Sequence, residues 1–505
     1  MNNKNKNQLA VFELYKALRA SDESSEELEQ LFEALNISVH LNAKSLNIGH
    51  FPQELKKSSF KKALDICSDR ILLINGGFPK NQTLGLEYYN LNKSLVLAKI
   101  LNTLSLRTAA LSVAEVLVER ADKYFFLNLS FEGYRIIYSV KMQLGDSRGF
   151  ETASAQFSKY LSYYQIEKEI EIEFNRFHLQ SAKTSSTQYN LVEQLEREIK
   201  RFSKYVNNIP SFYFHFYFYH LLYLKFTHSK QPDRVYKSAK NALKWFESLK
   251  FMHLPGRVHF ASIQIVYLIQ VREYDKAIPL IEKNKFLLRP YSLPWFRTIE
   301  KEIILYFHKG DFEKGVQVFF ESQNTSTHVS RDRRSQATWL LYEAYINLVL
   351  ETGSATYDGR KKRFSIQKFI NDLPEFSKDK RANNIPILIA QMLFFIVRKQ
   401  YNKAIDRIES LDKYASRYLR NDETFRSNCF IKMLLEIPKN SFNQLRVERA
   451  AEKYFRRLLD SDIDLIDQPF EIEIIPYERL WAIIMNHLRP DHHYTPKKPR
   501  DPVMQ

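Results

Sequence analysis

The sequence predicts an all-α protein, and three observations lead to this prediction. Glycine is scarce, with 12 among 505 residues, and residues 150–255 contain none, which does not suit a turn-rich β architecture. Hydrophobic residues make up 44% and charged residues 26% of the chain, the range of folded globular proteins. Aromatic residues reach 14% and supply wide, flat groups for packing helix against helix. We therefore expect helices throughout a chain long enough for a sizeable core.

The first part of the chain, residues 1–130, is predicted as a helical N-terminal cap region. It offers one helix over residues 8–18, an acidic helix start at residues 21–28, and a turn at the sequence NGGFPKN, residues 75–81. The first residues lack the apolar core and the small-residue cleavage site of a signal peptide. No signal peptide is therefore expected.

A recurring triplet organises residues 131–460. Each copy has an aromatic residue, a small residue three positions later and a bulky apolar residue four beyond, so all three share one helix face. The small residue lets a neighbouring helix approach closely. The copies are Phe150/Ala153/Phe157, Tyr236/Ala239/Leu243, Tyr274/Ala277/Ile281, Phe312/Gly315/Phe319, Tyr401/Ala404/Ile408 and a weaker Val447/Ala450/Tyr454.

The spacing of the triplets indicates a repeat. The step is 38 residues from Tyr236 to Tyr274 and again from Tyr274 to Phe312, whereas two wider gaps of 86 and 89 residues are near twice a unit of about 40. Each wide gap is predicted to contain one degenerate helix pair. These pairs are residues 158–179 with 188–206, and residues 336–351 with 365–376.

These residues resemble the tetratricopeptide family. The best match is GDFEKGVQVFF at residues 310–320, followed by REYDKAIPLI at 272–281 and KQYNKAIDRI at 399–408, which lack the family's glycine at the turn between the two helices. The family's tryptophan is absent, and the units here are longer than 34 residues. The resemblance implies antiparallel helix pairs stacked into a right-handed superhelical solenoid.

The resemblance also implies an inner groove lined by the first helix of each pair. Its inner positions here are mostly apolar, so no clamp for a partner's terminal carboxylate is expected, and the groove suits an amphipathic helix from a partner or from this chain. The predicted groove residues are Val266, Ile269, Arg297, Glu300, Ile304, Phe307, His308, Leu393 and Ile396.

Catalytic and metal sites are not expected, and no cofactor is predicted. The sequence has no GxxxxGK[ST], GxGxxG, HExxH or GxSxG motif. The acidic run at residues 460–471 has the spacing of a calcium loop, but Leu465 stands where that loop needs glycine. His215 and His220 lie five apart on a predicted helix, so they point in different directions and do not chelate one ion. A non-catalytic protein-binding scaffold is the leading interpretation.

Binding of RNA or DNA is the alternative interpretation. Lysine and arginine exceed aspartate and glutamate by 17, with a pI near 9.4, and this charge attracts polyanions. A compositional bias competes with it, because Asn, Lys, Ile, Phe and Tyr are all abundant. A possible basic rim, on one edge of the stack, consists of Arg331, Arg333, Arg334, Lys380, Arg381, Arg417 and Arg420.

The end of the chain is predicted as a C-terminal capping helix within residues 461–487 and a disordered basic tail over residues 488–505. Two cysteines, Cys67 and Cys429, do not build a disulfide framework, so a cytoplasmic location is expected. The most apolar window, residues 209–226, contains two histidines and a lysine and is predicted as a buried helix, not as a membrane span.

Overall fold

The structure, a computed structural model, describes part of the chain. The described residues are 38–42, 45–50, 83–181, 188–323, 333–359, 364–366, 369, 384–418, 425–465 and 473–490. Within them the fold is all-α, with 17 helices, apart from one antiparallel hairpin of β1 (Ser38–Asn42) and β2 (Ser45–His50). None of these helices is long and apolar enough to cross a membrane.

The β-hairpin lies in the region for which only helices were predicted. Its sequence alternates apolar and polar residues, with Val39 and Leu41 in β1 and Leu46 and Ile48 in β2. This period of two is the pattern of a strand, and it is only five to six residues long in each strand. The predicted helices at residues 8–18 and 21–28 lie outside the described residues.

The chain divides into two compact units. The first unit is built mainly of four consecutive helices, together with the later residues 201–217 and 249–253. Its helices are α4 (Thr83–Thr103), α5 (Arg107–Lys123), α6 (Leu127–Gln143) and the greater part of α7 (Ser147–Ser181). Helix α7 has 35 residues, so the helix predicted over residues 158–179 is the second half of a longer one.

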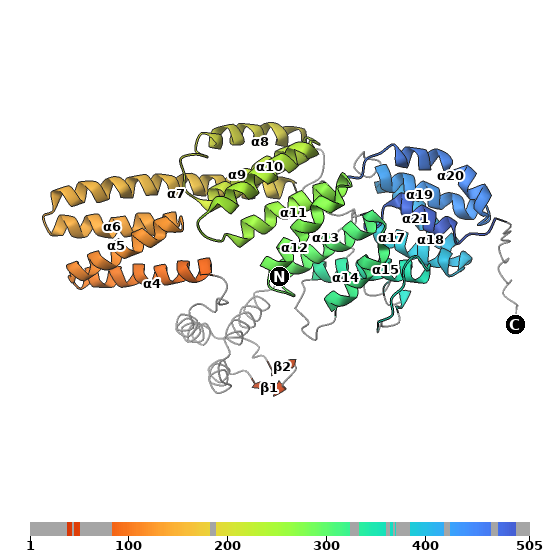
Figure 1. Cartoon of the computed structure of the whole chain (residues 1–505), viewed down its shortest axis with the longest axis horizontal. Helices are drawn as coiled ribbons and strands as arrows, with labels where there is room; N and C mark the ends of the chain where they lie inside the picture. The colour runs from red at the N-terminus through yellow and green to blue at the C-terminus, as the bar shows by residue number, and fades with distance from the viewer. Residues whose placement is uncertain are drawn as a thin grey trace. The chain divides into compact units, whose positions relative to one another are not determined.

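The second unit contains the other helices. They are α8 (Gln188–Ser203), α9 (Phe212–His228), α10 (Pro232–Ser248), α11 (Leu254–Gln270), α12 (Tyr274–Leu287), α13 (Leu293–Lys309), α14 (Phe312–Gln323), α15 (Arg333–Glu351), α17 (Asn384–Val397), α18 (Tyr401–Tyr418), α19 (Phe425–Lys439), α20 (Gln444–Leu459) and α21 (Tyr477–Met485). Part of α8 and the start of α9 are assigned to the first unit. Within the second unit, each helix from α10 to α14 packs on the next one along the chain (Figure 1).

One turn geometry recurs between successive helices. A residue with positive φ stands two positions before the first residue of the next helix: Ser105, Phe125, Gly145, Lys230, Arg272, Tyr291, Gly310, Lys399 and Phe442. Gly310 is the residue that resembles the family's turn glycine, and Arg272 and Lys399 adopt the same left-handed backbone without being glycine. The absence of glycine from these two turns therefore does not change their geometry.

The triplets mark the buried side of the second helix of a pair. Tyr274, Phe312 and Tyr401 are the first residues of α12, α14 and α18. The small residues of five triplets are buried, namely Ala153, Ala239, Ala277, Gly315 and Ala404. A Cβ atom at Gly315 would overlap the ring of Phe307, so this position requires a close helix–helix approach.

The sixth triplet was predicted one residue out of register. Ala450 is only half-buried, whereas Ala451 is fully buried together with Val447 and Leu458. These three residues are four and seven positions apart, so they lie on one face of α20. Sequence spacing alone did not distinguish two adjacent alanines.

Candidate functional site

The predicted groove residues form part of the interior of the second unit. Ile269, Phe307, Leu393 and Ile396 are fully buried within its hydrophobic core. Glu300, Ile304 and His308 are also buried, while Val266 and Arg297 are half-buried. The nine residues of α11, α13 and α17 that were predicted to line an inner groove are therefore buried or half-buried in the folded chain.

The C-terminal segment, defined as residues 461–465 and 473–490, reaches these first helices from a distant part of the sequence. The backbone N–H of Leu465 donates to the Gln270 side chain at the end of α11, at 3.1 Å. The Nε2 of His308 donates to the backbone carbonyl of Glu473, at 2.7 Å. Helix α21 packs on α17, α19 and α20. The chain itself thus supplies a short apolar helix to this face.

A buried arginine holds the segment in place. Arg426 of α19 donates from Nε to Oε1 of Glu473 at 2.6 Å and from Nη2 to Oε2 of Glu478 at 2.7 Å. Its Nη1 donates to the carbonyl oxygens of Leu458 and Ser461 at 2.8 and 2.7 Å. Burial alone would lower the pKa of this guanidinium, but the two carboxylates outweigh burial and raise it, so Arg426 stays charged.

Apolar and aromatic contacts add to this ionic anchor. The ring of Tyr477 stacks on Phe430 of α19, with centroids 4.5 Å apart, and its hydroxyl lies 3.0 Å from the Ser427 hydroxyl. Leu480 and Ile484 are fully buried one turn apart. Because α21 has nine residues, it is too short to be stable alone, and these contacts supply its stability.

His308 is a neutral donor in this arrangement. It is buried, and burial lowers its pKa from 6.5 to about 4, while the hydrogen bond to the Glu473 carbonyl opposes the shift. The neutral ring therefore carries its proton on Nε2 at physiological pH. His308 was predicted as a polar marker of the groove, and its partner is the backbone of this same chain.

Arg297 and Glu300 form a second polar group on the inner side of α13. Arg297 pairs with Glu300 at 3.0 Å, and the Trp339 indole N–H of α15 donates to the same carboxylate at 2.8 Å. The carboxylate is buried, so these two donors compensate for its loss of water. This group lies in the first half of α13 and His308 near its end, so two polar contacts flank the apolar residues Ile304 and Phe307.

The predicted basic rim lies largely beyond what the structure describes. Arg331, Lys380, Arg381 and Arg420 lie outside the described residues. Arg333 and Arg334 begin α15, and Arg417 lies near the end of α18. The rim therefore remains a prediction from the sequence.

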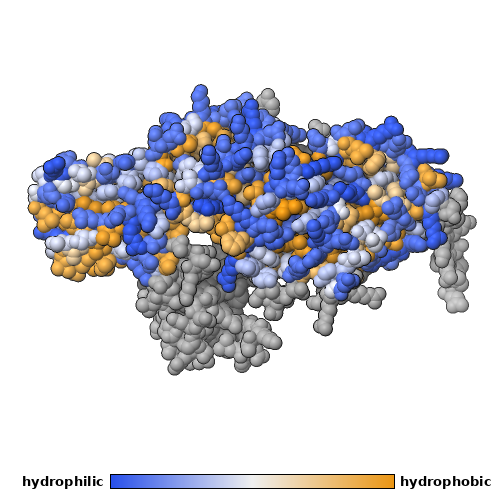
Figure 2. Space-filling model, viewed as in Figure 1, coloured by the Kyte–Doolittle hydropathy of each residue, from blue (hydrophilic) through white to orange (hydrophobic). Residues whose placement is uncertain are grey.

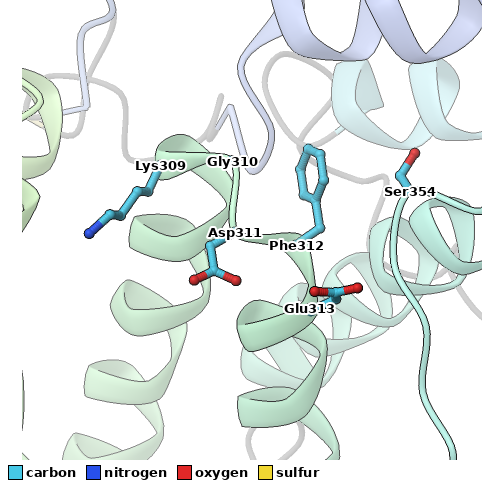
Figure 3. Close-up of a pocket in the computed structure, with 6 residues that line it drawn as sticks. All are labelled: Lys309, Gly310, Asp311, Phe312, Glu313 and Ser354. Carbon is cyan, nitrogen blue, oxygen red and sulfur yellow. The ribbon is translucent and has the colours of Figure 1, made fainter.

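A shallow hollow lies at the turn between α13 and α14 (Figure 3). It has a volume of about 450 Å³ and is lined by Lys309, Gly310, Asp311, Phe312, Glu313 and Ser354. Two of its three charged residues have other partners, since Lys309 pairs with Asp275 and Asp311 with Lys314. No nucleophile–base pair exists among these six lining residues.

Histidines approach each other elsewhere in the second unit. His220 Nδ1 of α9 lies 3.1 Å from His259 Nε2 of α11, and burial lowers the pKa of both rings, that of His259 to about 4. Among the described residues, no group of three or more His, Cys, Asp or Glu side chains is placed to hold a metal ion.

Sequence reasoning missed the principal anchor of the site. Arg426 and Glu473 are 47 residues apart and belong to no motif, and Glu473 follows the acidic run of residues 460–471 without being part of it. One signal was present. The sequence ERLWAIIM after Tyr477 combines acidic and apolar residues at helical spacing, which is typical of an amphipathic helix that needs a groove.

Comparison with known proteins gives no match. No protein-family model, no curated protein and no solved structure is significantly similar to this chain. The sequential packing of neighbouring helices is compatible with a helical repeat, and the likeness to the tetratricopeptide pattern rests on the residues described above.

Proposed function

We propose that this chain is a non-catalytic, cytoplasmic scaffold of tetratricopeptide-like helix pairs that binds a protein partner through its inner groove. In this proposal the pairs stack in the right-handed superhelical order that the resemblance implies. The partner contributes an amphipathic helix. The observation that supports this function is the contact between α21 and the first helices α17 and α19, because it is a helix-in-groove arrangement within one chain.

The contacts of α21 support a proposal for the chemistry of the partner helix. Arg426 is buried and takes two carboxylates, so a replacement for α21 needs an acidic side chain at the same point. Phe430 stacks on the ring of Tyr477, so the partner helix needs an aromatic residue at that position. Leu480 and Ile484 are fully buried, so the partner helix also needs branched apolar side chains at their positions. The partner we propose is therefore an acidic amphipathic helix that exchanges with α21.

Peptide competition tests this proposal. The full chain is used as bait in extracts of its source cells, with a synthetic peptide of residues 473–490 as competitor and a scrambled peptide as control. We expect the peptide, but not its scrambled form, to reduce partner capture at least about tenfold, the effect of losing about 1.4 kcal/mol of binding free energy. Capture that is indifferent to the peptide contradicts binding through the groove.

A matched pair of variants sharpens the test. Glu478→Gln removes one carboxylate from Arg426 and favours release of α21, so partner capture should rise. Glu448→Gln changes an exposed carboxylate of α20 and should leave capture unchanged. Equal capture by the two variants would exclude an exchange between the partner and α21.

A basic stripe on α10 favours nucleic-acid binding as the second candidate function. The nearby acids are engaged, because Asp233 accepts from Tyr267 and Glu247 pairs with Lys283. At 1.5 Å rise per residue the stripe is about 15 Å long, enough for about two phosphate contacts along a strand. Four exposed cations form it, none with an ion pair within the described part of the chain: Arg234, Lys237, Lys240 and Lys244.

Salt dependence decides this second candidate. A single-stranded oligonucleotide should bind at low salt, and the affinity should fall steeply between about 50 and about 200 mM salt. Changing Lys237, Lys240 and Lys244 to alanine should flatten the salt slope by about 0.7 per lost phosphate contact. The same change at Lys432, Lys439 and Lys453 serves as the control. An absence of binding at low salt contradicts the candidate.

A further inference from the structure

Helix α4 has apolar side chains on two opposite sides. Leu91, Leu95 and Ala98 are buried, at the side packed on α5 and α6. Leu97 and Ile100 of α4 and Leu104, which directly follows its last residue, are 47%, 51% and 63% exposed, and we call these three residues the α4 stripe. These positions are three and four apart, so they form one continuous face. Figure 2 shows apolar surface over the C-terminal end of α4.

This pattern is that of an interior helix. A helix that is apolar on all sides is normally buried, and a helix at the end of a stacked series carries a polar outer face. In α5, Val116 is exposed but its neighbours on the outer face are polar. In α4 the exposed apolar residues form a stripe over two turns. A further helix is therefore expected against the α4 stripe.

The sequence before α4 contains a seventh triplet. Phe60, Ala63 and Cys67 repeat the spacing of the six copies described above. The agreement extends to a shared lysine, since FKKA at residues 60–63 matches YDKA at 274–277, FEKG at 312–315 and YNKA at 401–404.

The number of residues from this triplet to the start of the next helix also agrees with the other copies. From Phe60 to the first residue of α4 is 23 residues. The corresponding steps from Tyr274, Phe312 and Tyr401 to the starts of α13, α15 and α19 are 19, 21 and 24 residues. Residues 60–74 thus have the sequence and the position of a second helix whose next first helix is α4.

We propose that the α4 stripe is the docking surface for residues 60–74 of this same chain. The pair α12–α13 gives the register, because Tyr274 at the start of one helix donates to the carbonyl of His308 near the end of the other, at 3.0 Å. In the same register Phe60 lies beside the last turn of α4. Cys67, two turns later, lies beside Leu97. This inference does not depend on the proposed partner-binding function.

A designed disulfide tests the register in the full chain. Leu97→Cys places a thiol on the α4 stripe, and the natural Cys67 is its expected partner, since the second natural thiol, Cys429, is buried. After mild oxidation we expect most chains to carry a disulfide within one chain, joining the introduced thiol to Cys67, as seen by peptide mass spectrometry. Val116→Cys, at an equally exposed position of α5, is the control and should not form it.

Two results would overturn the proposal. A disulfide between the introduced thiols of two chains assigns the α4 stripe to a second copy, and unreacted thiols leave it open to solvent. A second measurement follows Cys67 itself. Ile100→Asp puts a charge into the proposed contact and should speed alkylation of Cys67 at least about tenfold, whereas Val116→Asp should not. Equal alkylation rates in both variants also contradict the docking.

Discussion

Helix α4 of the first unit and helix α21 of the second unit both have apolar side chains on more than one face, but their surroundings differ. α21 buries Leu480, Trp481 and Ile484, and its covering helices include α17, which is not its neighbour along the chain. α4 buries one side against α5 and α6, which follow it directly, and leaves the stripe around Ile100 exposed within the described residues. The helices that follow α4 directly cover only one of its sides, whereas the cover of α21 includes a helix that is distant in the sequence.

The largest expected effect concerns the ionic anchor of α21. Arg426→Met leaves the Glu473 carboxylate buried without its partner and should lower the free energy of unfolding by about 3–5 kcal/mol, measured by urea denaturation. Arg120→Met, which breaks the more exposed Arg120–Glu87 pair of the first unit, should cost about 1 kcal/mol or less. Equal losses of unfolding free energy in the two variants would mean that the buried Arg426 pair contributes no more to stability than the exposed Arg120 pair.

The pH dependence of stability should identify His308 as part of the same anchor. Its pKa is about 4 in the folded chain and 6.5 in the unfolded chain, so the unfolded chain binds more protons between these values. The contribution of His308 to the free energy of unfolding should be complete above pH 6.5 and should fall by about 3 kcal/mol as the pH drops toward 4. His308→Gln keeps a donor for the Glu473 carbonyl and should flatten the curve. Identical pH profiles from thermal melting would exclude His308 as the titrating group.

Close helix packing at the triplets should give the next largest effect. Ala277→Leu adds volume at a fully buried position between α12 and its neighbours and should cost about 1–3 kcal/mol, with Ala404→Leu alike. Lys314→Ala, at an exposed position of α14, should stay within about 0.5 kcal/mol. Denaturant midpoints that agree among the three variants would mean that the triplets do not form the contacts that join successive helices.

The smallest effect concerns the turns. Lys399 has positive φ, and its change to glycine relieves about 1–2 kcal/mol of backbone strain while the unfolded chain gains about 0.4–1 kcal/mol of conformational entropy. Lys399→Gly should therefore raise the free energy of unfolding by about 0.5 kcal/mol. Gly310→Ala should lower it by about 1 kcal/mol, because its Cβ also meets the Arg479 guanidinium at 2.6 Å. Changes of the same sign in both variants would contradict the shared turn geometry.

Periodic, local features of the fold could be predicted from the sequence. The triplets that begin at Tyr274, Phe312 and Tyr401 were predicted to lie on single helix faces, and each of these residues begins a helix, because aromatic, small and apolar spacing is set by a single helix face. The long helix α7 was not predicted, since nothing in its sequence marks where one helix of a pair should end. The hairpin at residues 38–50 was also missed.

The candidate site was less predictable for a physical reason. The apolar pattern around Phe307 indicates a face that needs a cover, but the pattern is the same for a partner helix and for α21. The choice depends on contacts such as Arg426 with Glu473, which no spacing rule relates. Phe307 is fully buried in this chain's core, so its replacement by alanine lowers folding stability in addition to any effect on binding.

The bond between His308 and Glu473 has a consequence for the synthesis of the chain. The two residues are 165 positions apart, and translation at about 5–20 residues per second separates their appearance by about 8–33 s. Throughout this interval α11 and α13 are complete while residues 473–490 do not yet exist, so the side of α13 that carries His308 lacks this contact. The nascent chain therefore gains this long-range contact only when residues 473–490 emerge.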